Sequence, residues 1–428
     1  MMTTPVIRRS IRLALLGLVV VGSPALAAML MIDSGRDETA CAKPAWRCAL
    51  GEVRSGAKAA LADWRGRNPA GGRDQVVSSA EELSRAVAQA ANGAVIRLAP
   101  GDYPQVTIIG RDDRAGRGGV TITSADPARP ARIGMMLVRN TRGLTIRQME
   151  FAANPANTTS NSFQFLHNTR LTLDRIRVYG PENTEQAYQL RGMLVRDSDD
   201  VTITNLRFFN LQSGLHLLNA THVKVIGSEF WNLRIDGIHG GGVSDALIAG
   251  NVFTDFHPVP GDHPDAIQLW STDQQEPGRR IMIRDNLVVR GTGTQTQGVF
   301  IRDTHNVLPF EGVEIVNNLM IGTLYNGIAV DGLIGGRIEG NAVIALSDQK
   351  SWIRLQSARD VAVRNNNAPH FIILKSSGVE DKGNHVTGAQ VSYRRALHEW
   401  LDTPTGQEGV TRRRQDSVLL PLLEKAAP

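Results

Sequence analysis

The sequence is poor in aromatic residues and in excess charge of either sign, and each shortage excludes a class of protein. Phe, Trp and Tyr make up 5% of the 428 residues, so few rings are available to stack on nucleic-acid bases. The net charge of +5 owes three units to Arg8, Arg9 and Arg12, and the chain after residue 27 holds 44 basic and 42 acidic residues. A nearly neutral chain lacks the basic stripe of nucleic-acid-binding proteins. Charged residues, at 21%, are too few for a disordered chain.

A long uncharged run occurs near the N-terminus, where the 20 residues Leu13–Ile32 follow the three arginines. Ser23–Ala27 has the small-x-small form of a cleavage site, so residues 1–27 are predicted to be a signal peptide. The alternative is an uncleaved anchor that reaches residue 32, because about 20 apolar residues can span a bilayer. In both cases the rest of the chain is exported, and we expect a periplasmic or secreted protein without further membrane contact.

Cysteine is scarce, with only Cys41 and Cys48 in the chain. Both follow the predicted signal peptide, and exported proteins meet an oxidising compartment. We therefore expect a local disulfide between them, inside a linker over residues 28–74.

A repeat begins near residue 145 and determines the expected fold. Each unit has a short strand with alternating apolar residues, then a polar position, then a second short strand. The period is near 22–25 residues, with β-branched strands and no helical stripe, which predicts a parallel β-helix over residues 75–388. The aligned units are Leu144–Phe151, Val201–Phe208, Val223–Phe230, Ala246–Phe253, Ile281–Val288, Val313–Met320 and Gly336–Val343.

One polar position of the repeat is occupied by asparagine in successive units. A column of Asn at a strand corner predicts an asparagine ladder, in which each side-chain amide bonds the backbone of the next coil. Its members are Asn251, Asn286, Asn318, Asn341 and Asn366.

Helical patterns flank the repeat. Ser79 and Glu82 form a capping box before the stripe Leu83, Val87 and Ala90, which predicts a helix that covers the open first coil. Beyond residue 388, a stripe from Tyr393 to Leu401 predicts a helical C-terminal cap and tail over residues 389–428.

Insertions interrupt the repeat in its middle. An ordinary coil places its inner strand residue 10 positions after the Asn position and the next Asn position 13 later. The coil that starts at Asn251 has 16 and 19 instead, around Ile267, and the next coil has 13 and 19, around Val299. A smaller excess lies upstream, around residues 180–191. Loops added before and after one strand face predict a groove there.

The outward residues of these coils place several side chains capable of acid–base chemistry or sugar binding on one strand face. Ile238 and Gly240 are predicted to point inward, so His239 points outward, in line with Gln268 of the next coil. Strands about 4.8 Å apart bring successive coils within reach of a single sugar unit. The set consists of Asp236, His239, Asp262, His263, Asp265, Gln268, Trp270, Arg302 and Asp331.

This set suits proton abstraction next to a uronate carboxylate, the step that splits or epimerises acidic polysaccharides. Arg302 would neutralise the carboxylate, and His263 would act as base or acid. Asp262 or Asp265 would orient His263, and His239 would be the second acid or base. The predicted substrate-binding residues are Asp236, Gln268, Trp270 and Asp331.

Two segments resemble known families. The stretch Ser78–Tyr103, with its helix, apolar strand and Pro-Gly-x-Tyr turn, resembles the start of pectate-lyase-like proteins. Asp262-His263-Pro264-Asp265 resembles the Asp-Pro-His-Asp/Glu signature of alginate (mannuronan) C5-epimerases, with His and Pro exchanged. The resemblance implies an all-β, right-handed parallel β-helix that acts as a polysaccharide lyase or C5-epimerase. It also implies a catalytic His263 flanked by Asp262 and Asp265, with Arg302 as the downstream arginine.

Other functions stay open. Paired carboxylates among Asp236, Asp262 and Asp265 would suit an inverting glycoside hydrolase. The same surface could belong to a carbohydrate-binding scaffold without turnover. A metal site could be formed from Asp236, His239, Asp262 and His263. The two histidines do not suit Ca²⁺, and the spacing matches no known Zn²⁺ site, so neither a metal nor another cofactor is expected. We expect a monomer whose partner is a polysaccharide and not a nucleic acid.

Overall fold

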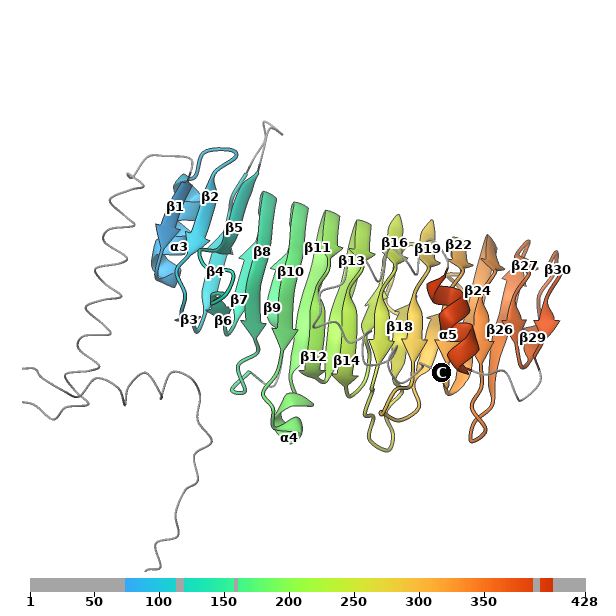
Figure 1. Cartoon of the computed structure of the whole chain (residues 1–428). Helices are drawn as coiled ribbons and strands as arrows, with labels where there is room; N and C mark the ends of the chain where they lie inside the picture. Colours follow the sequence, from blue (N-terminus) through green and yellow to red (C-terminus); the bar gives the residue numbers. More distant parts are fainter. Residues whose placement is uncertain (1–73, 113–118, 158–160, 388–392, 403–428) are drawn as a thin grey trace, which may run out of the picture. The chain divides into compact units, whose positions relative to one another are not determined.

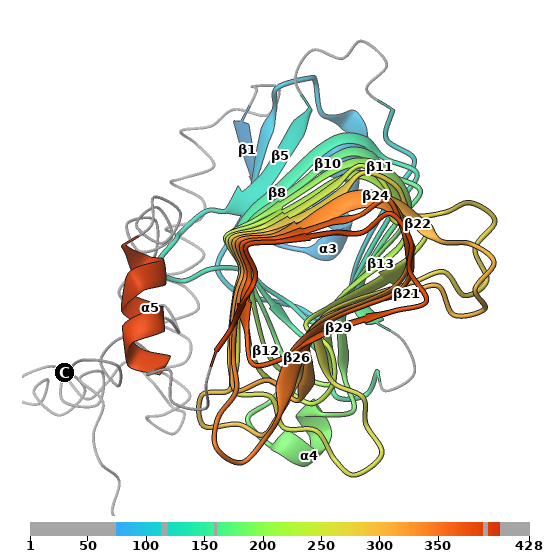
Figure 2. The ribbon, with the colours of Figure 1, turned by 90° about the vertical axis from the view of Figure 1, so that its right-hand side faces the viewer.

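The computed structural model describes residues 74–112, 119–157, 161–387 and 393–402. These residues form an all-β parallel solenoid of the right-handed type, with few helices. Figure 1 shows the strands side by side along one axis, and Figure 2 looks along that axis at three-sided coils lying over one another. The predicted signal peptide, the linker with Cys41 and Cys48 and the tail beyond residue 402 lie outside the described residues. No helix within the described part of the chain has the length and apolar character needed to cross a membrane.

Three parallel faces make up the coils, and some long strands bend from one face to the next. The first face carries the predicted site. Its strands are β4 (Val106–Ile109), β7 (Met136–Arg139), β9 (Asn161–Leu166), the first parts of β11 (Arg191–Thr204) and β13 (Ser213–Ile226), β15 (Ile238–Gly241), β18 (Asp265–Trp270), β21 (Gln297–Arg302), the first part of β24 (Tyr325–Glu339), β26 (Ser351–Arg359) and β29 (Phe371–Leu374).

The second face follows the first in each coil. Its strands are β1 (Asp74–Val77), β2 (Val95–Leu98), β5 (Val120–Ser124), the first parts of β8 (Arg142–Ala152) and β10 (Thr169–Tyr179), the second parts of β11, β13 and β24, β16 (Ala246–Ala249), β19 (Ile281–Arg284), β22 (Phe310–Val316), β27 (Ala362–Arg364) and β30 (Glu380–Lys382).

The third face closes each coil. Its strands are β3 (Asp102–Tyr103), β6 (Arg132–Ile133), the second parts of β8 and β10, β12 (Arg207–Leu211), β14 (Glu229–Leu233), β17 (Val252–Thr254), β20 (Leu287–Val289), β23 (Leu319–Ile321), β25 (Ala342–Ile344), β28 (Asn367–Ala368) and β31 (His385–Val386).

Three helices accompany the described coils: α3 (Ala80–Gln89), α4 (Thr184–Ala187) and α5 (Tyr393–Leu401). The Oγ atom of Ser79 accepts from the Glu82 backbone N–H at 3.1 Å, so Ser79 caps α3 as predicted. Figure 2 shows α3 at the far end of the solenoid and α5 beside the third face. Leu397 of α5 is buried in an apolar cluster with residues of β20 and β23. The capping roles of the terminal segments stay predictions.

The interior is one continuous apolar core built from inward residues that repeat from coil to coil. Phe208, Phe230 and Phe253 stack in register, with ring centroids 4.7 and 4.8 Å apart. Burying each such side chain stabilises the fold by roughly 1.5–3 kcal/mol, and stacked rings add to this. Because a coil buries its apolar residues only against its neighbours, the strands that carry the predicted site depend on the coils on both sides.

The asparagine ladder is confirmed and is longer than predicted. The Asn251 backbone N–H donates to the Asn286 side-chain oxygen at 3.0 Å, and the same bond repeats through Asn318 and Asn341 to Asn366. Asn384 continues it beyond the last predicted member, and Ser228 replaces asparagine at its upstream end. The ladder lies between the second and third faces, so it fixes the stacking of the coils at the corner without large insertions.

The insertions lie at the other two corners. Residues 255–264 and 290–296 precede β18 and β21, and residues 271–280 and 303–309 follow them. The upstream excess near residue 180 contains α4. The added loops therefore stand on both sides of the first face around β18 and β21, as the spacings predicted.

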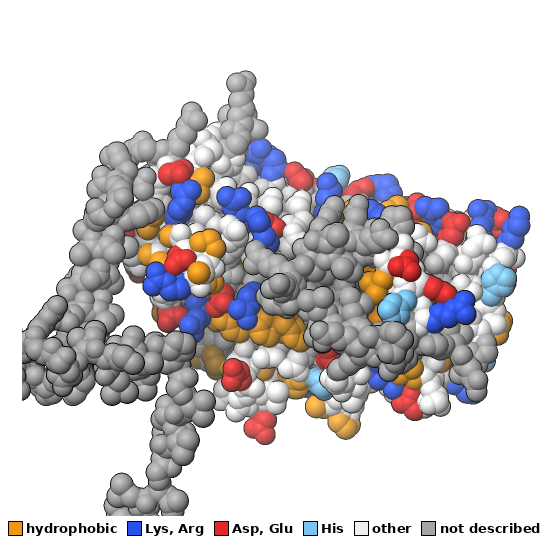
Figure 3. Space-filling view, in the orientation of Figure 1, with side chains coloured by type: hydrophobic (Ala, Val, Ile, Leu, Met, Phe, Trp, Pro, Cys, Tyr) orange, Lys and Arg blue, Asp and Glu red, His pale blue; other side chains and the backbone are white. Residues whose placement is uncertain are grey.

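Charges of both signs are interspersed on the visible surface in Figure 3, without a large patch of one sign. Several pair across neighbouring coils, such as Arg280 with Asp245 at 2.5 Å and Arg337 with Glu314 at 2.7 Å. This agrees with the nearly neutral composition.

Candidate functional site

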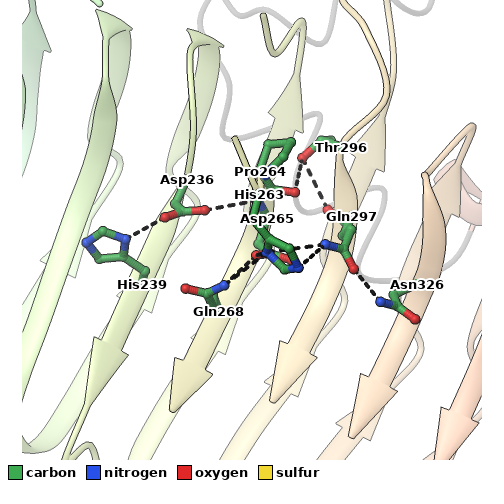
Figure 4. A network of polar contacts seen from close by, with 9 residues as sticks. All are labelled: Asp236, His239, His263, Pro264, Asp265, Gln268, Thr296, Gln297 and Asn326. Atoms are coloured by element: carbon green, nitrogen blue, oxygen red, sulfur yellow. Dashed lines mark hydrogen bonds and ion pairs between the residues drawn. The ribbon is translucent and has the colours of Figure 1, made fainter. Parts of the chain in front are cut away.

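The outward columns of the first face have the register that the sequence predicted. His216, His239, Gln268 and Phe300 are successive partners, and Trp270 pairs with Arg302. In the position that begins each strand, Asp265 pairs with Gln297. Figure 4 shows the polar network that these positions build across neighbouring strands.

His263 and Asp265 form a hydrogen-bonded pair at the start of β18. His263 Nδ1 lies 2.8 Å from Asp265 Oδ2, and 55% of the histidine side chain is exposed while the aspartate side chain is fully buried. Burial raises the pKa of Asp265 to about 7, although the hydrogen bond from His263 opposes the shift. The same hydrogen bond raises the pKa of His263. The exposed imidazole of His263 is thus hydrogen-bonded to the carboxylate of Asp265, which is shielded from solvent.

A series of hydrogen-bonded side chains fixes which nitrogen of His263 is unprotonated. Trp352 Nε1 can only donate, and it donates to Asn326 Oδ1 at 2.7 Å. The Asn326 amide must then donate to Gln297 Oε1, which leaves the Gln297 amide nitrogen facing His263 Nε2 at 2.8 Å. His263 Nε2 is therefore an acceptor and Nδ1 carries the proton shared with Asp265. An imidazole in this tautomer presents a lone pair and can act as a base.

A second pair, His239 with Asp236, lies one coil upstream. His239 Nδ1 lies 2.6 Å from Asp236 Oδ2, and Asp236 Oδ1 accepts from the Asp265 backbone N–H at 3.0 Å. The two pairs are therefore joined through a single carboxylate and a backbone amide. This network holds both histidines on adjacent strands of one face (Figure 4).

Aromatic rings surround His239. The His216 ring lies 3.5 Å from it between centroids, and the Trp270 ring packs edge-on at 5.4 Å. Burial lowers the pKa of His216 to about 2, so this ring is neutral. Gly241 lies beneath Trp270, and a Cβ there would come within 2.8 Å of the indole nitrogen. The glycine therefore lets the indole lie close over the preceding strand.

Asp262 has other partners than His263. Its two oxygens accept from Arg234 Nε and Nη2 at 2.8 and 2.9 Å, and it also accepts from the Val259 backbone N–H at 2.8 Å. The guanidinium lowers the pKa of Asp262. Of the two aspartates proposed to orient His263, Asp265 makes the contact, while Asp262 anchors the inserted loop.

The remaining predicted residues divide between the network and the open face. Gln268 donates to Asp265 Oδ2 at 2.6 Å, so it supports the buried carboxylate. Arg302 is exposed on β21, in register with Asp331 of the next coil. The His263 ring packs edge-on against Phe300 at 5.1 Å, and Phe300 precedes Arg302 by two residues on the same strand. Arg302 thus stands on the same side of the face as His263.

Gln297, Asn326 and Trp352 were not among the predicted site residues. Gln297 could have been found, because the column that holds Asp236 and Asp265 continues into it. Asn326 extends the same column, because it precedes Ile328 by the two residues that separate Gln297 from its partner Val299. Trp352 carries no such signal, since it pairs with Asn326 only through the register shift between β24 and β26. No group of three or more His, Cys, Asp or Glu side chains suited to a metal ion occurs within the described ranges.

No protein-family model matches the sequence, and no curated protein matches it. Solved structures do match. The surface adhesin PfbA of Streptococcus pneumoniae is 12% identical, with a TM-score of 0.46, over 73% of this chain and 97% of that one. The A-module of a mannuronan C-5 epimerase from Azotobacter vinelandii is 13% identical, with a TM-score of 0.37, over 74% and 98%. A lacto-N-biosidase from Eubacterium ramulus is 8% identical, with a TM-score of 0.43, over 72% and 64%. The likeness concerns the fold alone.

Proposed function

We propose that this protein acts on a uronate-containing polysaccharide by removing the proton next to the carboxylate, as a lyase or a C5-epimerase. The observation that carries the proposal is the state of His263, which is exposed, bonded through Nδ1 to a buried carboxylate and left unprotonated at Nε2, where it faces the Gln297 amide. A base oriented by a third group in this way is the common arrangement of general-base catalysis.

His263, Arg302 and His239 have separate roles in the proposed reaction. The sugar C5–H replaces the Gln297 amide at His263 Nε2 and gives up its proton there, while Arg302 offsets the charge that develops on the carboxylate. In elimination, the electron pair forms the C4–C5 double bond and the C4–O4 bond breaks. In epimerisation, C5 receives a proton from the opposite face. His239, one strand away, would supply the proton to the leaving oxygen or to C5.

The carboxylates themselves are poorly placed for glycoside hydrolysis. Asp265 is fully buried, Asp262 is bonded to Arg234, and Asp236 is buried with both oxygens engaged. An inverting hydrolase needs two carboxyl groups that reach the sugar and an attacking water. His263-centred chemistry therefore has the stronger support.

Export is part of the proposal and rests on the N-terminal sequence alone. The arginines, the apolar run and the small residues before residue 28 are those of a signal peptide or anchor. A periplasmic or secreted location would bring the protein to its polysaccharide. Cell fractionation of the full chain with a C-terminal epitope tests this, and a purely cytoplasmic signal would overturn it.

Proton NMR in D₂O tests the reaction. Alginate, polygalacturonate and neutral glycans are incubated with the wild-type protein, with His263→Ala and with His385→Ala, which removes an exposed histidine of β31. New vinyl signals identify a lyase, and deuterium at C5 without chain cleavage identifies an epimerase. Both should vanish in His263→Ala and persist in His385→Ala. New reducing ends alone would replace the proposal by a hydrolase, and binding without any change by a binding scaffold.

A further inference from the structure

Tyr325, the first residue of β24, has an unusual backbone. Its φ is 36°, and it is the only Phe, Tyr or Trp with positive φ among the described residues. The other non-glycine residues of this kind are mostly Asn and Asp, which tolerate the left-handed region, whereas a bulky side chain there is strained. The side chain is also 47% exposed, so burial in the core does not account for the strain.

The strand is irregular at the same place. The register of β24 against β26 shifts between Asn326 and Ile328, immediately after Tyr325. Such bulges turn side chains away from the regular pleat. Here the result is an aromatic pair, because the Tyr325 ring stacks on Trp352 with centroids 5.2 Å apart and planes 24° apart.

The aromatic pair is connected to the catalytic histidine. Trp352 is the donor at the end of the chain that runs through Asn326 and Gln297 to His263. Asn326 lies two coils from Asp265, which corresponds to about 10 Å along the solenoid axis at about 4.8 Å per strand. A polysaccharide that lies along the axis with one unit at His263 would therefore bring another unit to Tyr325 and Trp352.

A cleft opens beside Tyr325. It has a volume of about 850 Å³, and its lining includes Tyr325, Asp348, Lys350 and His370. Asp348 is bonded to Arg290 of the loop before β21 at 2.7 Å. Thr296 of the same loop donates to the Pro264 carbonyl oxygen at 3.1 Å. One loop thus bonds a residue of the cleft lining and the residue that follows His263.

The geometry points to a second sugar-binding subsite at Tyr325 and Trp352, which holds a uronate unit of the polysaccharide whose reacting unit lies at His263. The inference rests on the proposed function and adds the position of a distal unit. Aromatic rings with polar neighbours suit a sugar, whose C–H faces are apolar and whose rim is polar. Arg354 follows Trp352 by two residues on the outward side of β26, where it can meet the carboxylate of that unit.

Binding measurements with oligomers of different length test the subsite. The probes are oligomannuronates and oligogalacturonates from the dimer upward, titrated by calorimetry into the wild-type protein, Tyr325→Asn, Tyr325→Phe and the control Trp231→Ala. Trp231 also stacks on a neighbouring ring, at 4.5 Å from Phe209, but on the third face. Activity on the polymers and thermal unfolding are measured with the same proteins.

We expect Tyr325→Asn to weaken the binding of longer oligomers roughly three- to tenfold, the value of one aromatic contact, and to leave the dimer unchanged. Its melting temperature should equal or exceed that of the wild type, since Asn tolerates positive φ. Trp231→Ala should bind like the wild type, and Tyr325→Phe, which keeps the stacked ring, should restore most of the binding that Tyr325→Asn loses.

The outcomes separate the two proposals. If the wild type binds and converts a uronate polymer but Tyr325→Asn does so equally well at every length, the subsite is wrong and the proposed function stands. Equal weakening of dimer and longer oligomers also overturns the subsite. If no uronate oligomer binds to or is changed by the wild type, the proposed function fails, and the subsite with it.

Discussion

The two histidine–aspartate pairs lie one coil apart and use the same Nδ1-to-carboxylate contact, yet their surroundings differ. His239 is 16% exposed between His216 and Trp270, whereas His263 is 55% exposed. Asp236 has partners on both oxygens, whereas Asp265 Oδ1 is buried without a hydrogen-bond partner among the described residues. The pair on the regular strand is enclosed, whereas the histidine of the pair that follows the inserted loop is exposed. We therefore attribute the differences in exposure and hydrogen bonding between the two pairs to the inserted loop.

The largest expected effect on kcat comes from replacing His263, and it should exceed the effect of replacing His239. His263→Ala should lower kcat roughly 10²- to 10⁴-fold, the usual contribution of a general base. His239→Ala should cost less, about tenfold, because an enclosed proton donor can be replaced in part by water. Steady-state kinetics on the polysaccharide identified by NMR would measure both. A greater loss in His239→Ala would reverse the assignment of base and acid.

The next largest effect on kcat is expected from replacing Asp265, the buried carboxylate. Asp265→Asn should lower kcat on the order of 10²-fold, since the amide no longer favours the Nδ1–H tautomer. In the wild type the pKa of Asp265 is raised from 3.8 to about 7 and that of His263 is raised above 6.5. Both shifts favour the fold at low pH. The Asp265 contribution is lost as the pH rises from about 4 through 7, and the His263 contribution is lost only as the pH rises above 6.5.

Thermal unfolding against pH checks this sign. The melting temperature of the wild type should fall across that window, and the melting temperature of Asp265→Asn should fall less. Asp236→Asn is the matched control, because it changes the carboxylate of the enclosed pair. A wild-type melting temperature that rises across this pH window would contradict a raised pKa for the buried Asp265.

A smaller effect on kcat is expected from replacing Trp352, which donates the first hydrogen bond of the series through Asn326 and Gln297 to His263. Trp352→Phe keeps a ring but removes the N–H that orients Asn326, so the Gln297 amide can turn over. One hydrogen bond of this kind is worth about 0.5–1.5 kcal/mol, which corresponds to a two- to tenfold loss in kcat. Nitrogen-15 NMR of the His263 ring would report the tautomer directly. An unchanged Nδ1–H signal in Trp352→Phe would show that Asp265 alone fixes it.

The smallest effect on chemistry belongs to Asp262. Asp262→Asn should destabilise the protein by about 1–2 kcal/mol, because it breaks the bidentate bond to Arg234, and kcat should change less than about twofold. Asp245→Asn breaks a more exposed pair with Arg280, which should destabilise the protein less than Asp262→Asn does. Denaturant unfolding compares the two. A selective loss of kcat in Asp262→Asn would return this residue to the catalytic group.

The sequence predicts the columns of the first face better than the contacts within them. Strand alternation and the Asn spacings place His239, Gln268 and Phe300 in one row, because the parallel register is regular. The choice between Asp262 and Asp265 could not be made from neighbouring positions. It depends on Arg234, which lies 28 residues before Asp262 and meets it through the turn of the inserted loop. The contact of Trp352 with Asn326 depends on a register shift between β24 and β26 that no periodic pattern reveals.

The asparagine ladder has a consequence for engineering. Consecutive rungs are separated by 35, 32, 23 and 25 residues from Asn251 to Asn366, yet the hydrogen bonds between them are nearly identical, at 2.9–3.0 Å. The coil spacing is thus set at one corner and does not depend on the length of the loops at the other two. The segment 271–280 should therefore accept foreign peptides as a display site, with the strands on either side still aligned by the same column of amides.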